Sequence, residues 1–144
     1  GPSLGIRYLG LGAETLRSGP APLRRAGADY QSMYARRRYL TQPASYAPQP
    51  GVFNLLLSHN PDVFPRAAEL GFQLTLSGHT HGGQVNFEIL HEHLNVARFY
   101  TPYTRGLYQE DGKAVYVSAG LGTVAAPVRL GAPPEVTLIR LCAA

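Results

Sequence analysis

This chain has one cysteine, no tryptophan and no long hydrophobic run. The single cysteine, Cys142, excludes an internal disulfide and any zinc module built from several thiolates. No apolar run approaches the ~18 residues of a membrane-spanning helix, and no secretory signal pattern opens the chain. We therefore expect a cytoplasmic or membrane-associated protein, the extracytoplasmic face included, without a signal or spanning segment in this chain.

Acidic residues are also scarce, and aspartate most of all. The 144 residues contain three aspartates, Asp29, Asp62 and Asp111. The net charge of +4 comes from the first 50 residues, which hold seven arginines and two acidic groups. The run Arg36-Arg37-Arg38 could attract phosphate, a membrane surface or nucleic acid, although a solvated helix face is the plainer interpretation.

The pattern of apolar residues changes near residue 51. Residues 1–51 form a variable basic segment that ends in a proline-rich loop, and residues 52–144 carry the clearer pattern; we treat the two together as a single partial domain. We expect strands at 4–11, 52–57, 72–76, 84–89, 105–109, 114–118 and 135–141, and helices at 28–40 and 61–70. Asp111-Gly112 is a hairpin signal between two of these strands. The order predicts a strand-rich α/β fold.

Histidines follow two of the predicted strands. His59 follows the first strand of a strand–helix–strand unit, and His79 and His81 follow the second, inside the glycine-rich run 78–83. The carboxyl ends of adjacent parallel strands meet at one edge of a sheet, and side chains two apart at a strand end leave on the same face. Neutral imidazole is the commonest metal ligand, so these three residues predict a metal site. His91 and His93 form a competing pair that we assign to an exposed loop or edge strand.

These stretches resemble the C-terminal half of a calcineurin-like metallophosphoesterase, most of all its bacterial, often membrane-associated branch. The resemblance rests on residues 55–62 (LLLSHNPD), 74–84 (LTLSGHTHGGQ), 103–108 (YTRGLY), 116–122 (YVSAGLG) and 129–138 (RLGAPPEVTL). It covers about residues 52–141 well and residues 20–50 hardly at all.

The resemblance implies a sandwich of two mixed sheets flanked by helices. It also implies two divalent metals, Mn, Fe, Zn or Co, bridged by an aspartate and a hydroxide that attacks phosphorus. His59 and His79 would bind one metal and His81 the other. The substrate would be a phosphomonoester or phosphodiester, nucleotides and lipid-linked pyrophosphates included.

The N-terminal motifs of that family, Asp-x-His, Gly-Asp-x-x-Asp and Gly-Asn-His, are missing here. Three neutral ligands cannot balance two divalent cations a few ångströms apart. We therefore expect this chain to hold no metal, or one metal weakly, and to be inactive alone. Its expected partners are a phosphoester substrate and the missing half of the domain, or a second copy through an exposed sheet edge.

Two alternatives stay open. One is a stand-alone module with a single metal bound by His59, His79 and His81. The other is a non-enzymatic module that binds anions or nucleic acid through the basic segment, with nucleic acid the less favoured ligand. Asn60 and Asp62 could orient His59 or cap a helix, and Arg105 and Arg129 could contact phosphate or serve the structure.

Overall fold

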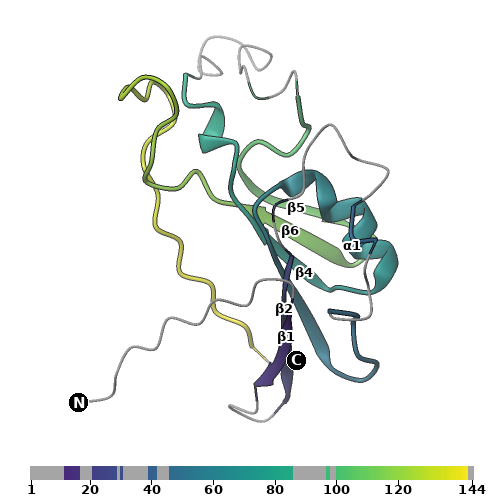
Figure 1. Cartoon of the computed structure of the whole chain (residues 1–144). Coiled ribbons are helices and arrows are strands. Elements are labelled where there is room, and N and C mark those ends of the chain that lie inside the picture. Colours follow the sequence, from purple (N-terminus) through teal and green to yellow (C-terminus); the bar gives the residue numbers. More distant parts are fainter. Residues whose placement is uncertain are drawn as a thin grey trace, which may run out of the picture.

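The computed structural model of the chain describes residues 12–16, 21–28, 30, 39–41, 46–85, 97 and 100–142 (Figure 1). Within them, six strands form one mixed sheet in the order β1-β2-β3-β4-β6-β5. The strands are β1 (Ala13–Leu16), β2 (Leu23–Ala28), β3 (Phe53–Ser58), β4 (Leu74–Ser77), β5 (Gly106–Glu110) and β6 (Lys113–Val117). The expected α/β class is confirmed. A second packed sheet is not among the described residues.

The four inner strands of the sheet are parallel. β2 pairs with β3, β3 with β4, and β4 with β6, all in parallel register, while β1 and β5 lie antiparallel at the two edges. Leu56 of β3 and Val115 of β6 are fully buried, which is typical of strands covered on both faces. The predicted strand–helix–strand unit is therefore confirmed, and the exits of β3 and β4 lie side by side.

The connection between β3 and β4 is helical. It begins with the 3-10 turn η3 (Pro61–Val63) and continues as α1 (Phe64–Leu70). The Asn60 side chain accepts a hydrogen bond from the backbone N–H of Asp62, the capping role that the sequence allowed. Gly71 ends the helix with a left-handed φ of 105°. Phe64 of α1 packs on Val115 and Val117 of β6, so the helix covers one face of the sheet (Figure 1). Burial of one such side chain stabilises the fold by about 1.5–3 kcal/mol.

The predicted hairpin is also present. β5 and β6 pair antiparallel from Gly106↔Val117 to Glu110↔Lys113. Asp111 and Gly112 have φ values of 47° and 70°. Two successive positive φ values are typical of the type I′ turn that Asp-Gly favours, because its twist matches that of the flanking strands.

Two predicted elements are wrong in whole or in part, and others lie outside the described residues. Residues 131–142 form no strand, and the side chains of Val136 and Leu138 are 83% and 93% exposed, because no described strand pairs with this segment. The predicted helix at 28–40 is wrong at its start, where Ala28 belongs to β2, and at its end, where Tyr39 and Leu40 lie in a turn. The predicted strand at 4–11, most of the one at 84–89, and the pair His91 and His93 lie outside the described residues; Val85 forms an isolated bridge with Leu130.

Two strands from the first third of the chain, β1 and β2, join the sheet. β1 and β2 were not predicted, because Arg24, Arg25 and Gly27 interrupt the apolar pattern of β2. Arg25 forms an ion pair with Glu14 across the β1–β2 pair. None of the helices in the described part of the chain has the length and apolar character needed to cross a bilayer.

Candidate metal centre

The ends of β3 and β4 bring His59 and His79 together. Leu57 of β3 pairs with Leu76 of β4, and the Gly78 N–H donates to the His59 carbonyl at 3.2 Å just beyond the strands. His79 Nδ1 lies 3.0 Å from His59 Nε2, with ring centroids 4.8 Å apart. The ring of Tyr30 lies beside both imidazoles, at centroid distances of 5.9 and 6.4 Å.

His79 Nδ1 and His59 Nε2 are within hydrogen-bonding distance of each other, and their spacing can be compared with that of two ligands of one metal. Ligand nitrogens about 2.05 Å from a tetrahedral metal are about 3.3 Å apart, close to the 3.0 Å that separates His79 Nδ1 from His59 Nε2. Burial lowers the pKa of His59, and the neighbouring His79 and His81 lower it further. The neutral imidazole that results is the form that binds metals.

His81 points to a different partner. Its Nδ1–H donates to the Gly122 carbonyl at 3.0 Å, because a carbonyl oxygen can only accept. This leaves the Nε2 lone pair of His81 available to a ligand. In the part of the chain that the structure describes, no group of three or more His, Cys, Asp or Glu side chains gathers around one point. The geometry thus pairs the rings of His59 and His79 and bonds the His81 ring to Gly122, and the metal roles of all three remain predictions.

The histidine turn has an unusual backbone. Positive φ values occur at His79 (70°), His81 (52°), Gly82 (64°), Gly83 (88°) and Gln84 (49°). The expectation that His79 and His81 leave one face of a strand is wrong, because β4 ends at Ser77 and both histidines adopt left-handed conformations. Non-glycine residues rarely adopt this region, and such strain gathers at functional sites.

Packing and hydrogen bonds hold the strained turn in place. Thr80 Oγ1 donates to the Thr104 carbonyl at 2.5 Å. A Cβ on Gly82 would lie 3.3 Å from the Cβ atoms of both Ala119 and Ala132. The turn therefore packs against two later segments of the chain.

Arg129 is the residue at this site whose role the sequence reveals least. Its guanidinium donates to five backbone carbonyls around the histidine turn. One of these carbonyls belongs to His81 and another to Gly122, the partner of the His81 ring. An isolated arginine before Leu-Gly in the sequence gives no signal of such a network.

The other candidate side chains have structural contacts. Asn60 is buried, caps η3, and donates through Nδ2 to the Tyr39 hydroxyl at 3.2 Å. Asp62 accepts a short hydrogen bond from the Thr101 hydroxyl. Arg105 Nε lies 3.2 Å from Glu135 Oε2, while its Cδ lies 3.6 Å from the position of a Cβ on Gly82. Arg105 is therefore the candidate of these three that borders the histidine turn.

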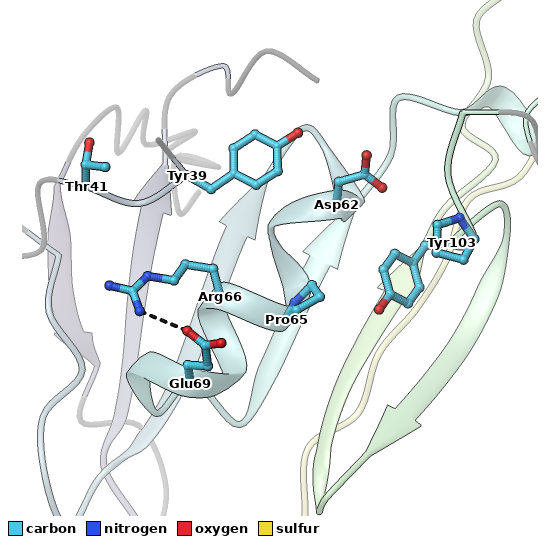
Figure 2. A pocket seen from close by; sticks show the side chains of 8 residues that line it. Tyr39, Thr41, Asp62, Pro65, Arg66, Glu69 and Tyr103 are labelled. Atoms are coloured by element: carbon cyan, nitrogen blue, oxygen red, sulfur yellow. Dashed lines mark hydrogen bonds and ion pairs between the residues drawn. The ribbon is translucent and has the colours of Figure 1, made fainter. Parts of the chain in front are cut away.

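A separate open pocket lies over the start of α1 (Figure 2). Its volume is about 520 Å³, and Figure 2 shows Asp62 at its rim between Tyr39 and Tyr103. Arg66 and Glu69, which also line it, form an ion pair with an N–O distance of 2.9 Å. The lining residues are Tyr39, Thr41, Asp62, Pro65, Arg66, Glu69, Pro102 and Tyr103. The histidines are not among them, so this hollow is distinct from the candidate metal centre.

Known proteins resemble the C-terminal 60% of this chain. An uncharacterized metallophosphoesterase of Bacillus subtilis, YkuE, is 37% identical over 99 residues, which cover 62% of this chain and 31% of the relative. The phosphodiesterase YaeI of Escherichia coli is 34% identical over 99 residues, covering 69% of this chain and 35% of the relative. A bovine transmembrane protein with a metallophosphoesterase domain is 43% identical over 94 residues, or 62% of this chain and 20% of the relative.

The matches cover only part of each relative. The chain spans about a third or less of the length of these three proteins. No family model matches the chain, and no solved structure does. These similarities support a partial region of the calcineurin-like metallophosphoesterase family in the C-terminal part of this chain.

Proposed function

We propose that this chain is the C-terminal part of a metal-dependent phosphoesterase and contributes the histidine half of its centre. The observation that supports this most is the pair of facing nitrogens, His59 Nε2 and His79 Nδ1, 3.0 Å apart where two parallel strands end. The names of the relatives, metallophosphoesterase and phosphodiesterase, agree with it.

The donor set fits half of a two-metal site. The three candidate ligands are neutral imidazoles, and no carboxylate gathers with them among the described residues. Two divalent cations close together need an anionic ligand between them. We propose that aspartate and asparagine ligands come from a segment of the parent protein that precedes this chain. The bound metals would supply charge stabilisation on phosphate oxygens and activation of water.

The roles proposed for the histidines of this chain are those that the family resemblance implies. His59 Nε2 and His79 Nδ1 would bind one divalent metal, and His81 Nε2 would bind the other. Arg105 engages Glu135 through Nε, and its side chain is 40% exposed beside the histidine turn. We propose that its remaining N–H groups bind phosphate oxygens of a phosphomonoester or phosphodiester, with nucleotides and lipid-linked pyrophosphates as the candidate classes.

The test compares this chain with the proposed longer protein, which would carry the missing carboxylate ligands. With Mn²⁺ present, we expect the longer protein to hydrolyse bis(p-nitrophenyl) phosphate and the 144-residue chain to be inactive. His79→Ala in the longer protein should remove turnover, whereas Arg66→Ala, on the exposed face of α1, should leave it unchanged. Turnover that survives His79→Ala would contradict the proposal, as would equal activity of the short chain.

A further inference from the structure

Arg129 uses its entire hydrogen-bonding capacity on the backbone around His81. A guanidinium has five N–H donors. Here Nε donates to Ala132 O at 2.6 Å, Nη1 to Gly120 O and Gly122 O at 3.2 and 2.6 Å, and Nη2 to His81 O and Ala119 O at 3.0 and 2.8 Å. No donor is left for a substrate, so Arg129 does not serve as a phosphate ligand in this arrangement.

Two of these bonds control His81 directly. Nη2 holds the carbonyl of His81 itself, a residue with a φ of 52° that needs external support. Nη1 holds the carbonyl of Gly122, which also accepts the His81 Nδ1–H at 3.0 Å. One guanidinium therefore fixes both the backbone of His81 and the acceptor that orients its ring.

The orientation has a chemical consequence. A ring nitrogen that donates to a carbonyl must carry the proton, and the other nitrogen of the neutral ring then presents its lone pair. A hydrogen bond from the ring nitrogen that does not bind the metal usually fixes the tautomer of a metal-binding histidine. Here the partner of the second nitrogen, the Gly122 carbonyl, is itself held by Arg129.

We propose that Arg129 is a positioning residue that sets His81 in the Nδ1–H tautomer and directs its Nε2 lone pair outward as a donor to a divalent cation. The part of this proposal that concerns a cation rests on the proposed function, whereas the part that concerns the His81 tautomer does not. The role differs from general loop stabilisation, because it acts on one ring through the Gly122 carbonyl.

Gln84 offers a matched control. Its side chain ties the same loop to the histidine turn through Val124 N at 2.6 Å, Val124 O at 2.8 Å and Ala126 O at 3.1 Å. These contacts anchor the loop without involving Gly122 O or the carbonyl of His81. Gln84→Ala therefore loosens the loop while leaving the Arg129–Gly122–His81 network intact.

The test records two-bond ¹H–¹⁵N spectra of the histidine rings in the 144-residue chain above pH 7.5, without added metal, with His81 assigned from a His81→Ala variant. We expect the native chain to show a single Nδ1–H tautomer at His81. Arg129→Ala and Arg129→Lys should lose that signature and give averaged shifts, whereas Gln84→Ala should keep it. Unfolding midpoints measured in parallel confirm that each variant is folded.

Three results would overturn the proposal. Folded Arg129 variants that keep the single tautomer would do so, and so would a Gln84→Ala variant that loses it. Failure of both Arg129 variants to fold, while Gln84→Ala folds, would assign Arg129 to global stability. A native chain that shows the tautomer, together with turnover that survives His79→Ala in the longer protein, would instead count against the proposed function alone.

Discussion

At the scale of single residues, Gly82 carries the clearest stability prediction. Its φ is 64°, and a Cβ there would lie 3.3 Å from Ala119 Cβ and Ala132 Cβ. Gly82→Ala should lower the free energy of unfolding by about 2–3 kcal/mol, because left-handed strain and overpacking add. The matched control is Gly112→Ala, with a φ of 70° and no atom within 4 Å, which should cost about 1 kcal/mol. Equal costs in urea denaturation would contradict the packing of the histidine turn.

Glu135 carries a pH prediction. Hydrogen bonds from the hydroxyls of Thr137 and Tyr116, in that order of effect, and the nearby Arg105 lower the pKa of Glu135 below its ordinary value of 4.5. Because the folded state favours the ionised carboxylate, this stabilisation is fully present above pH 4.5 and is lost as the pH falls through the lowered pKa.

Glu135→Gln should remove that dependence. Urea midpoints of the native chain, followed from pH 6 downward, should fall more steeply below pH 4.5 than those of the variant. If the urea midpoints of the two proteins fall in parallel with pH, the contacts of Glu135 do not stabilise its ionised form.

The sequence predicts some functional residues and hides others, for physical reasons. His59, His79 and His81 are visible because a rare residue type follows two apolar runs beside glycines. Arg129 is hidden because its partners lie as far as 48 residues away and are all backbone carbonyls, which leave no pattern of side chains. Tyr30 is hidden for a related reason: its place beside His59 depends on the position of the segment that follows β2.

At the scale of elements, local signals predicted β3, α1, β4 and the β5–β6 hairpin, where caps, turns and apolar runs agree. They failed for β2, whose Arg24 and Arg25 interrupt the apolar pattern, although it pairs with β3 along its whole length. They also failed for 135–141, where alternation is present but no described strand supplies a partner. Alternation predicts which side chains share a face; it does not supply a neighbouring strand.

The cap of the helical connection gives a prediction at this scale. Asn60→Ala removes the acceptor of the Asp62 N–H and the donor to the Tyr39 hydroxyl, and should lower the free energy of unfolding by about 1–2 kcal/mol. Asn60→Ser keeps an acceptor at the cap and should restore part of the loss. Thermal unfolding measures the stability of both variants. If Asn60→Ser is no more stable than Asn60→Ala, the lost stability does not come from the cap hydrogen bond.

At the scale of the whole molecule, the described part of the chain has sheet edges with no further strand paired to them and exposed apolar side chains. β1 and β5 are the edge strands of the sheet, and Leu107 on β5 is 58% exposed. Further exposed apolar side chains follow the sheet: Leu121, Val124, Val128, Leu130, Val136, Leu138, Ile139 and Leu141. Exposed edges and patches of this kind promote association, and in the proposed parent protein the rest of the domain would cover them.

We therefore expect the isolated chain to self-associate. Sedimentation velocity over a hundredfold concentration range should show a rising average mass. The double variant Val136→Lys with Leu138→Lys should weaken the association, because these two side chains are 83% and 93% exposed and their replacement leaves the sheet intact. A native chain that stays monomeric at the highest concentration would count against an uncovered interface.

The central claim, that His59 and His79 form one half of a metal centre, is tested most directly by calorimetric titration of Zn²⁺ into the chain and its three single histidine variants. We predict weak binding of one Zn²⁺ per native chain, lost in His59→Ala and His79→Ala and kept in His81→Ala, because the facing nitrogens belong to the first two residues. Binding that persists in His79→Ala, or that only His81→Ala removes, would contradict it.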